Sequence, residues 1–244
     1  MTHGSLFSGI GGFDLGFEWA GIETKWQVEI EPFCQRVLAK HWPNVKRYGD
    51  IRECGKHNLE AVDIISGGFP CQDISQAGER IGIDGERSGL WGQMYRILRE
   101  LRPKFAVVEN VAALLDRGME RVLWDLAEGG FDAEWSVLSA CQFGAAHTRE
   151  RVFIVAYPTR NGLEGAWKRG AHGEGMDAWD SSAEAIAQMR LHFPATPPTS
   201  AMGVAYGFPH WMDRISGLGN AVVPQITEWI GRRIIENTET HRTN

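Results

Sequence analysis

The chain has 244 residues, of which 43% are hydrophobic and 23% are charged, and its formal net charge is −6. This length and composition predict a globular protein with one large domain, or one domain with a small insertion. They exclude a membrane-spanning chain, because no apolar run approaches the roughly 18 residues that cross a bilayer. The first residues do not resemble a secretory signal, so we expect a cytoplasmic protein.

The negative charge weighs against nucleic-acid binding, because phosphate contacts need lysine and arginine. Basic residues nevertheless cluster in three short stretches, at residues 36–47, 96–104 and 147–151. The net charge therefore leaves room for a basic face that binds DNA.

The cysteines are scattered and form no CxxC pair; they are Cys34, Cys54, Cys71 and Cys141. This spacing argues against a zinc site and against a disulfide framework, and it is typical of a reducing cytosol. We therefore expect no metal site.

Short apolar runs alternate with helical patterns over the first 156 residues, as in β-α-β units. Strands are predicted at residues 4–7, 24–29, 62–66, 105–109, 133–138 and 152–156. Helices are predicted at residues 31–41, 91–101 and 119–128, and a further helical pattern follows the glycine-rich residues 9–12. This order predicts an α/β fold with a doubly wound, mostly parallel sheet.

The composition changes at residue 157, after which glycine, proline and polar residues dominate up to about residue 205. Within this stretch a capping pattern indicates a short helix at about 181–191. Residues 207–220 have the composition of a loop, residues 224–235 predict an amphipathic helix, and the last nine residues are expected to fray. We therefore predict a main domain of residues 1–156 and 206–244, with a small inserted lobe at 157–205.

A glycine-rich turn follows the first predicted strand and contains Gly9, Gly11 and Gly12. Glycines at this point let the backbone turn tightly and approach a ligand at a helix start. Glu29 lies about 20 residues further on, where a ribose-binding carboxylate is expected, and Asp50 is a candidate acceptor for an adenine amino group. The alternative is a plain turn with two solvated carboxylates. Together the three features favour a nucleoside cofactor.

Two further groups follow predicted strands and are candidates for chemistry. Cys71 lies in the loop Gly68-Phe69-Pro70-Cys71-Gln72, and Glu109 begins Glu109-Asn110-Val111. Because loops at the carboxyl ends of strands form the ligand crevice of such sheets, we expect the thiol and the carboxyl group to be neighbours. A thiol in such a loop can have its pKa lowered into the reactive range. Taken alone, Cys71 would be a buried structural thiol and Glu109 a helix N-terminal acid.

Arg149 and Arg151 alternate around Glu150 at the start of the last predicted strand of the main sheet. In an extended segment both side chains would point to the same face, and paired arginines suit carbonyl and phosphate recognition. The alternative is a surface charge pair with Glu150.

A last motif near the end of the chain is Gly219-Asn220-Ala221-Val222-Val223-Pro224. With this motif included, the chain resembles the DNA cytosine-5 methyltransferase family, in which the same motifs occur in the same order. The resemblance implies the fold of S-adenosylmethionine-dependent methyltransferases and methyl transfer to carbon 5 of cytosine through a covalent cysteine adduct on a flipped base. It implies catalytic roles for Cys71, Glu109, Arg149 and Arg151. The cofactor would contact Phe7, Gly9, Ile10, Gly11, Gly12, Glu29, Ile30, Asp50, Ile51, Pro70, Leu90, Asn220, Ala221 and Val222.

The same resemblance implies double-stranded DNA as the partner and a monomer without metal. It places the enzyme in the cytoplasm of a bacterial or phage-infected cell, associated with DNA and serving methylation such as restriction–modification. The chain departs from the family at His147, where the family has glutamine, and in its short target-recognition region of residues 157–205.

Other functions remain open. One is an RNA cytosine-5 methyltransferase, and another is a non-catalytic nucleic-acid-binding or cofactor-binding relative. A nicotinamide-dependent oxidoreductase would not explain the loop that carries Cys71.

Overall fold

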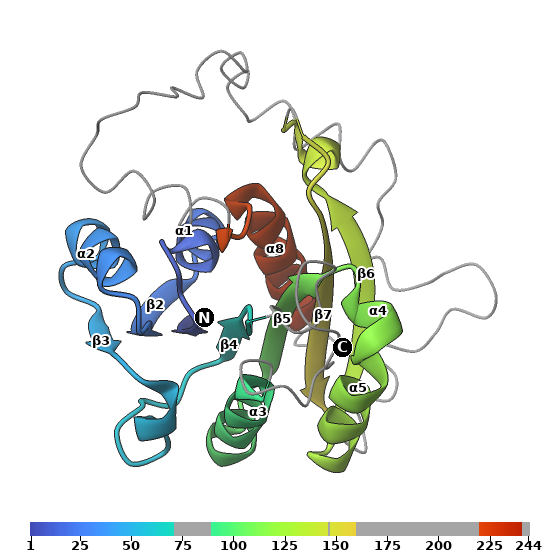
Figure 1. Cartoon of the computed structure of the whole chain (residues 1–244), viewed down its shortest axis with the longest axis horizontal. Coiled ribbons are helices and arrows are strands. Elements are labelled where there is room, and N and C mark those ends of the chain that lie inside the picture. Colours follow the sequence, from blue (N-terminus) through green and yellow to red (C-terminus); the bar gives the residue numbers. More distant parts are fainter. Residues whose placement is uncertain (71–88, 146, 160–219, 241–244) are drawn as a thin grey trace.

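A computed structural model of the chain describes residues 1–70, 89–145, 147–159 and 220–240 (Figure 1). The predicted nucleophile Cys71, the helix expected at 181–191 and most of the predicted lobe at 157–205 lie outside the described residues.

The described strands form one seven-stranded sheet in the order β3-β2-β1-β4-β5-β7-β6. Their bounds are β1 (Thr2–Leu6), β2 (Glu23–Val28), β3 (Lys46–Tyr48), β4 (Ile64–Gly67), β5 (Phe105–Val111), β6 (Phe131–Ser139) and β7 (Glu150–Pro158). Strand β7 runs antiparallel to both of its neighbours, whereas the pairs from β3 to β5 are parallel. The predicted doubly wound, mostly parallel sheet is confirmed.

Helices pack on both faces of this sheet (Figure 1). Their bounds are α1 (Gly12–Trp19), α2 (Pro32–His41), α3 (Leu90–Leu101), α4 (Leu114–Arg117), α5 (Met119–Glu128) and α8 (Pro224–Thr240), with short 3₁₀ turns η1 (Ile51–Glu53) and η3 (Ala140–Phe143). Three predicted helices, at 31–41, 91–101 and 119–128, match α2, α3 and α5 to within one residue at each end.

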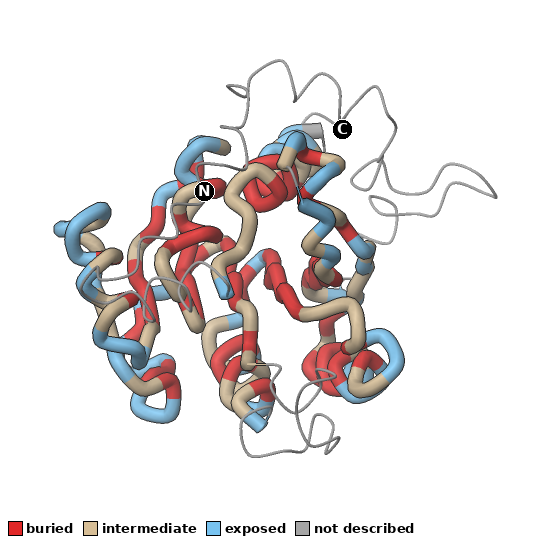
Figure 2. The backbone as a smooth tube through the Cα atoms, turned by 45° about the horizontal axis from the view of Figure 1, so that its top comes forward, coloured by how far each residue is buried: buried red, intermediate tan, exposed pale blue. Residues whose placement is uncertain are grey.

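The sheet separates two hydrophobic clusters. Val108 belongs to the cluster that also contains Met94 of α3, and its neighbour Val107 belongs to the cluster that contains Phe17 of α1 and Trp229 of α8. Because successive side chains of a strand point to opposite faces, the two clusters cover the two faces of β5. Strands buried on both faces read as continuous apolar runs, which is why the central strands are visible in the sequence. Figure 2 shows the buried residues concentrated along these strands.

Helix α8 packs directly on α1, although more than 200 residues separate them in the chain (Figure 1). The contact is so close that a Cβ at Gly16 would lie 1.9 Å from Thr227 Oγ1 and 2.2 Å from the Pro224 carbonyl oxygen. The Thr227 hydroxyl also donates to the Gly12 carbonyl at 3.2 Å. The contact brings residues 220–223, which precede α8, back to the glycine-rich turn.

Three features differ from the sequence-based predictions. Strand β3 was not expected, because it has three residues, two of them the charged Lys46 and Arg47, and no apolar alternation. The four-residue helix α4 is likewise too short to produce a periodic pattern. The prediction that the last nine residues fray is wrong for residues 236–240, because α8 continues to Thr240. In this last part of α8 the side chains of Asn237 and Thr238 donate to the carbonyls four residues earlier, at 2.9 and 2.7 Å.

Among the described residues, no helix combines the length and the apolar character needed to cross a membrane.

The contact between α1 and α8 predicts that Gly16→Ala lowers the free energy of unfolding by about 1–3 kcal/mol, the usual cost of overpacking a well-packed contact. Gly92→Ala in α3 is the matched control, because its Cβ would meet nothing within 4 Å. We expect the control to be neutral or to stabilise by up to about 1 kcal/mol. Urea unfolding followed by circular dichroism measures both, and equal stability of the two variants would contradict the close helix contact.

Candidate active site

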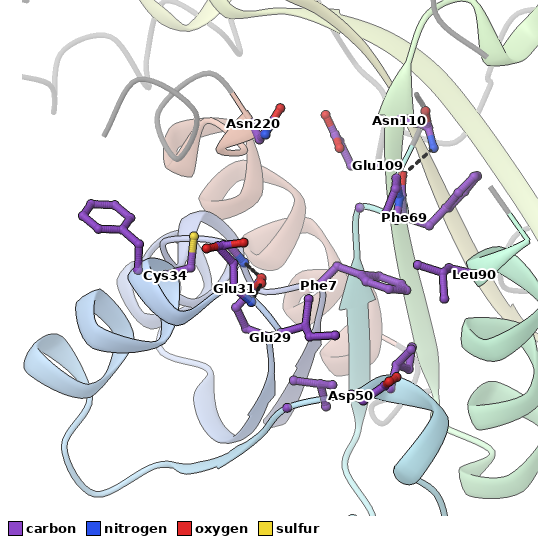
Figure 3. Close-up of a pocket in the computed structure, with 18 of the residues that line it drawn as sticks. Phe7, Glu29, Glu31, Cys34, Asp50, Phe69, Leu90, Glu109, Asn110 and Asn220 are labelled. Atoms are coloured by element: carbon purple, nitrogen blue, oxygen red, sulfur yellow. Dashed lines mark hydrogen bonds between the residues drawn. The ribbon is translucent and has the colours of Figure 1, made fainter. Parts of the chain in front are cut away.

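The main cavity lies where β1, β2, β4 and β5 end, and its volume is about 510 Å³ (Figure 3). This is the edge at which ligands bind in open α/β sheets. Most residues predicted from the sequence line it: Phe7, Gly9, Glu29, Ile30, Asp50, Ile51, Pro70, Leu90, Glu109, Arg149, Arg151 and Asn220. Ile10, Gly11, Gly12, Ala221 and Val222 are not part of this lining.

The glycine-rich turn connects β1 to α1 and contributes Gly9 to the cavity lining. Gly9 and Gly11 have φ angles of +56° and +92°, which glycine adopts without steric cost. A Cβ at Gly11 would lie 2.4 Å from the Trp42 ring, and a Cβ at Gly12 would lie 2.4 Å from the Val222 carbonyl oxygen. Gly11 and Gly12 therefore allow close packing behind the cavity, and only Gly9 of the three reaches its surface.

Glu29 follows β2 and joins the glycine-rich turn to the start of α2. Its Oε2 accepts from the backbone N–H of Gly9 at 2.7 Å, and its Oε1 accepts from that of Glu31, also at 2.7 Å. Burial raises the pKa of Glu29 despite these bonds. Each carboxylate oxygen has two lone pairs, so Glu29 keeps acceptor capacity for the hydroxyl groups of a ligand such as a ribose.

Asp50 follows β3 and caps the turn η1. Its Oδ1 accepts from the backbone N–H of Arg52 at 2.9 Å, and the Arg52 guanidinium bonds both carboxylate oxygens at 3.0 Å. The hydrogen bonds from Arg52 lower the pKa of Asp50 below its ordinary value. Arg52 also lines the cavity and was not among the predicted site residues. In the sequence, only its position two residues after Asp50 associates Arg52 with the site.

Glu109, which is buried, and Arg151, which is partly exposed, form an ion pair where β5 and β7 border the cavity. Arg151 Nε lies 3.0 Å from Glu109 Oε1, and Glu109 is only 8% exposed. Burial raises the pKa of Glu109 to about 7, and this effect outweighs the opposite influence of Arg151 and Arg149. A carboxyl group in this state can both donate and accept a hydrogen bond near neutral pH.

Arg149 lines the same cavity, but its backbone conformation differs from the extended one predicted from the sequence. It precedes β7 and has a φ of +29°, so the two arginines are not successive outward positions of one extended segment. The Arg149 side chain instead donates to the Ala221 carbonyl at 2.8 Å. Arg149 thereby links the start of β7 to the segment before α8.

Asn110 supports the loop that continues into Cys71. Its side-chain amide donates to the Phe69 carbonyl at 3.1 Å, and Asn110 is 2% exposed. Figure 3 shows this bond between the end of β5 and the segment after β4. Asn110 and Phe69 line the cavity but were not among the predicted site residues, because their contact spans 41 positions. Glu31, Phe33 and Cys34 at the start of α2 were also missed.

The family model for C-5 cytosine-specific DNA methylases matches residues 1–184. Curated relatives include type II methyltransferase M2.BsuMI of Bacillus subtilis, which is 39% identical over 62% of this chain and 41% of its own length. Another, M.NgoFVII of Neisseria gonorrhoeae, is 32% identical over 76% of this chain and 52% of its own length. The chain thus spans about half the length of these two relatives or less.

A third relative has a length similar to that of this chain. M.AquIA of Picosynechococcus is 32% identical over 80% of this chain and 90% of its own length. Among solved structures, a protein encoded within an E. coli prophage has a TM-score of 0.66 at 18% identity, with 98% of this chain and 99% of that chain covered. The methyltransferase EhMeth of Entamoeba histolytica has a TM-score of 0.67 at 14% identity, with 98% of each chain covered. These two structures share the fold.

The raised pKa of Glu109 predicts a pH-dependent effect on stability. The folded chain holds this proton more strongly than the unfolded chain, whose pKa is near 4.5, so the stabilisation is complete below that pH and is lost as the pH rises through about 7. The full change is at most about 3 kcal/mol. Glu109→Gln cannot ionise, so its free energy of unfolding should lack this decline.

Urea unfolding at several pH values between 4.5 and 8 measures the difference between wild type and Glu109→Gln. Glu120→Gln changes an exposed glutamate of α5 and serves as the control, which should follow the wild type. A constant difference between wild type and Glu109→Gln across this range would contradict the assigned environment of Glu109.

Proposed function

Because this chain belongs to the C-5 cytosine-specific DNA methylase family, we propose that it transfers a methyl group from S-adenosylmethionine to carbon 5 of cytosine in DNA. The observation that carries this proposal is one cavity with Glu29 and Asp50 in one part and Glu109 in another, which we call its two ends (Figure 3). One end has the glycine-rich turn and two carboxylates, and the other has the ion pair of Glu109 and Arg151.

S-adenosylmethionine is the methyl donor that membership of this family implies, and when bound it supplies the methyl group. The described residues fit it: Gly9 leaves open space beside the turn, and Glu29 offers acceptors for ribose hydroxyls. Asp50 and Ile51 would face the adenine, with Phe7 and Leu90 as apolar neighbours in the same lining.

The Glu109 end would receive a cytosine that has been flipped out of the helix, because carbon 5 of a stacked base is hard to reach. With a pKa of about 7, Glu109 can keep a proton to donate to ring nitrogen 3 while its other oxygen accepts from the exocyclic amino group. Arg151 would hold the exocyclic oxygen, and Arg149 would support the same region. These contacts stabilise the negative charge that develops on the ring.

Cys71 would act as the nucleophile. Its thiolate adds to carbon 6, which makes carbon 5 nucleophilic toward the methyl group, and loss of the carbon 5 proton then expels the thiolate. Cys71 lies outside the described residues, and its assignment follows from its place one residue after Pro70 of the cavity lining. The Asn110 bond to Phe69 would steady the approach to this loop.

Other parts of the proposal concern the protein's setting. We place target recognition in residues 157–205, within a chain whose catalytic domain is residues 1–156 and 206–244, and we take the active form to be a cytoplasmic monomer acting on double-stranded DNA. Bacterial relatives described as type II methyltransferases support a role in restriction–modification.

Transfer of a tritiated methyl group to DNA tests the reaction and the nucleophile together. We expect the wild type to label DNA at carbon 5 of cytosine and Cys71→Ser to lose this activity, because a hydroxyl ionises far less readily than a thiol near pKa 8.5. Cys141→Ser is the matched control, since Cys141 is exposed and should not affect transfer. Near-normal transfer by Cys71→Ser would refute the nucleophile, and labelling of transfer RNA instead of DNA would favour the RNA alternative.

A further inference from the structure

An arginine in the second turn of α3 is bonded to the turn that carries Asp50. Arg96 Nη2 donates to the carbonyl oxygens of Cys54 at 2.8 Å and of Ile51 at 3.2 Å. Its Nε donates to Gln93 Oε1 at 3.0 Å, which fixes the orientation of the guanidinium plane. A planar guanidinium is suited to such a fork, because several N–H groups can bond at once without further loss of side-chain freedom.

Glu100 completes this arrangement one helical turn later. Arg96 Nη1 lies 2.8 Å from Glu100 Oε1, and Glu100 Oε2 accepts from the Lys56 backbone N–H at 2.9 Å. The approach is close, since a Cβ at Gly55 would lie 2.5 Å from Glu100 Oε2 and 3.1 Å from Arg96 Nη1. Arg96 and Glu100, which we call the α3 clamp, therefore hold residues 51–56 at both ends.

The segment held by the α3 clamp begins at the wall of the main cavity. Asp50 and Ile51 line that cavity, and so does Leu90, the first residue of α3 (Figure 3). Arg96 itself is not part of the lining. Within the turn, the N–H of Glu53 donates to the Asp50 carbonyl and that of Cys54 to the Ile51 carbonyl, at 3.0 and 3.1 Å. The position of Asp50 is thus coupled to the carbonyls that Arg96 holds.

We propose that Arg96 is a positioning residue for the methyl donor, acting through the turn that carries Asp50 and Ile51. This inference rests on the proposed function, because it takes Asp50 and Ile51 as the wall that faces the adenine. Hydrogen bonds from a charged donor are about twice as strong as neutral ones. Their loss frees the turn and leaves the Cys54 and Ile51 carbonyls without the guanidinium, so a bound base would have to order the turn itself.

Calorimetric binding of S-adenosylhomocysteine to the full chain provides the test. We expect Arg96→Ala to weaken binding by about tenfold, equivalent to about 1.4 kcal/mol. Arg96→Lys should fall between this variant and the wild type, because a lysine keeps the charge but cannot form the fork. Arg99→Ala is the matched control on the same helix, since Arg99 lies over the Tyr95 ring and outside the cavity lining. Its affinity should stay within about twofold of the wild type.

A second readout separates positioning from general damage to the fold. The analogue S-inosylhomocysteine carries an oxygen in place of the adenine amino group, so it lacks the donor that Asp50 would accept. We expect Arg96→Ala to reduce the preference of the protein for S-adenosylhomocysteine over this analogue, and to raise the KM for the donor while leaving kcat and the KM for DNA close to wild type. Equal weakening of both ligands by Arg96→Ala would overturn the positioning role.

The possible failures can be told apart. If the wild type does not bind S-adenosylhomocysteine, the proposed function fails and this inference fails with it. If the wild type binds and Arg96→Ala binds equally well, only the inference fails. Circular dichroism of each variant at the assay temperature verifies that the measured protein is folded. If Arg96→Ala does not fold, Arg96→Lys is compared with the wild type instead.

Discussion

The reversed direction of β7 is the constraint on which the site depends. Because β7 runs antiparallel to β5, its first residues lie beside the last residues of β5, and the register pairs Arg151 with Val111 and Phe153 with Glu109. If β7 were parallel to β5, an arginine at its start would lie beside the first residues of β5, at the opposite end of the strands. The reversed strand β7 therefore brings a cationic side chain to the carboxyl ends of the parallel strands, where the carboxylates and tight turns of the site lie.

The ion pair that results has unusual electrostatics. The opposite charge on Arg151 favours ionised Glu109, but removal from water disfavours it more, and the pKa rises to about 7. When a carboxylate is buried, loss of water can cost more than the attraction to its partner returns, so the pair is weak evidence for stability. The raised pKa instead leaves Glu109 able to donate a proton as well as to accept hydrogen bonds near neutral pH, which is the property that the proposed function uses.

Much of this arrangement could be predicted from the sequence, because it is local. Apolar runs revealed the central strands, and Gly9 and Glu29, which follow strands, line the cavity. Glu109 lines it too, but from inside β5, which continues two residues beyond the predicted strand end. The rest depends on contacts between distant segments. Asn110 bonds Phe69, and Arg149 reaches Ala221 from a left-handed conformation. No local pattern encodes such pairs, and β3 is too short to produce one.

In the proposed function, the two ends of the cavity bind different ligands. Equilibrium dialysis of S-adenosylhomocysteine against wild type, Glu29→Ala and Glu109→Gln tests this most directly. We predict that Glu29→Ala weakens binding by roughly 1–3 kcal/mol, the cost of removing one partner of a buried hydrogen bond, whereas Glu109→Gln binds like the wild type. Weakened binding by Glu109→Gln together with unchanged binding by Glu29→Ala would contradict the assignment of the two ends.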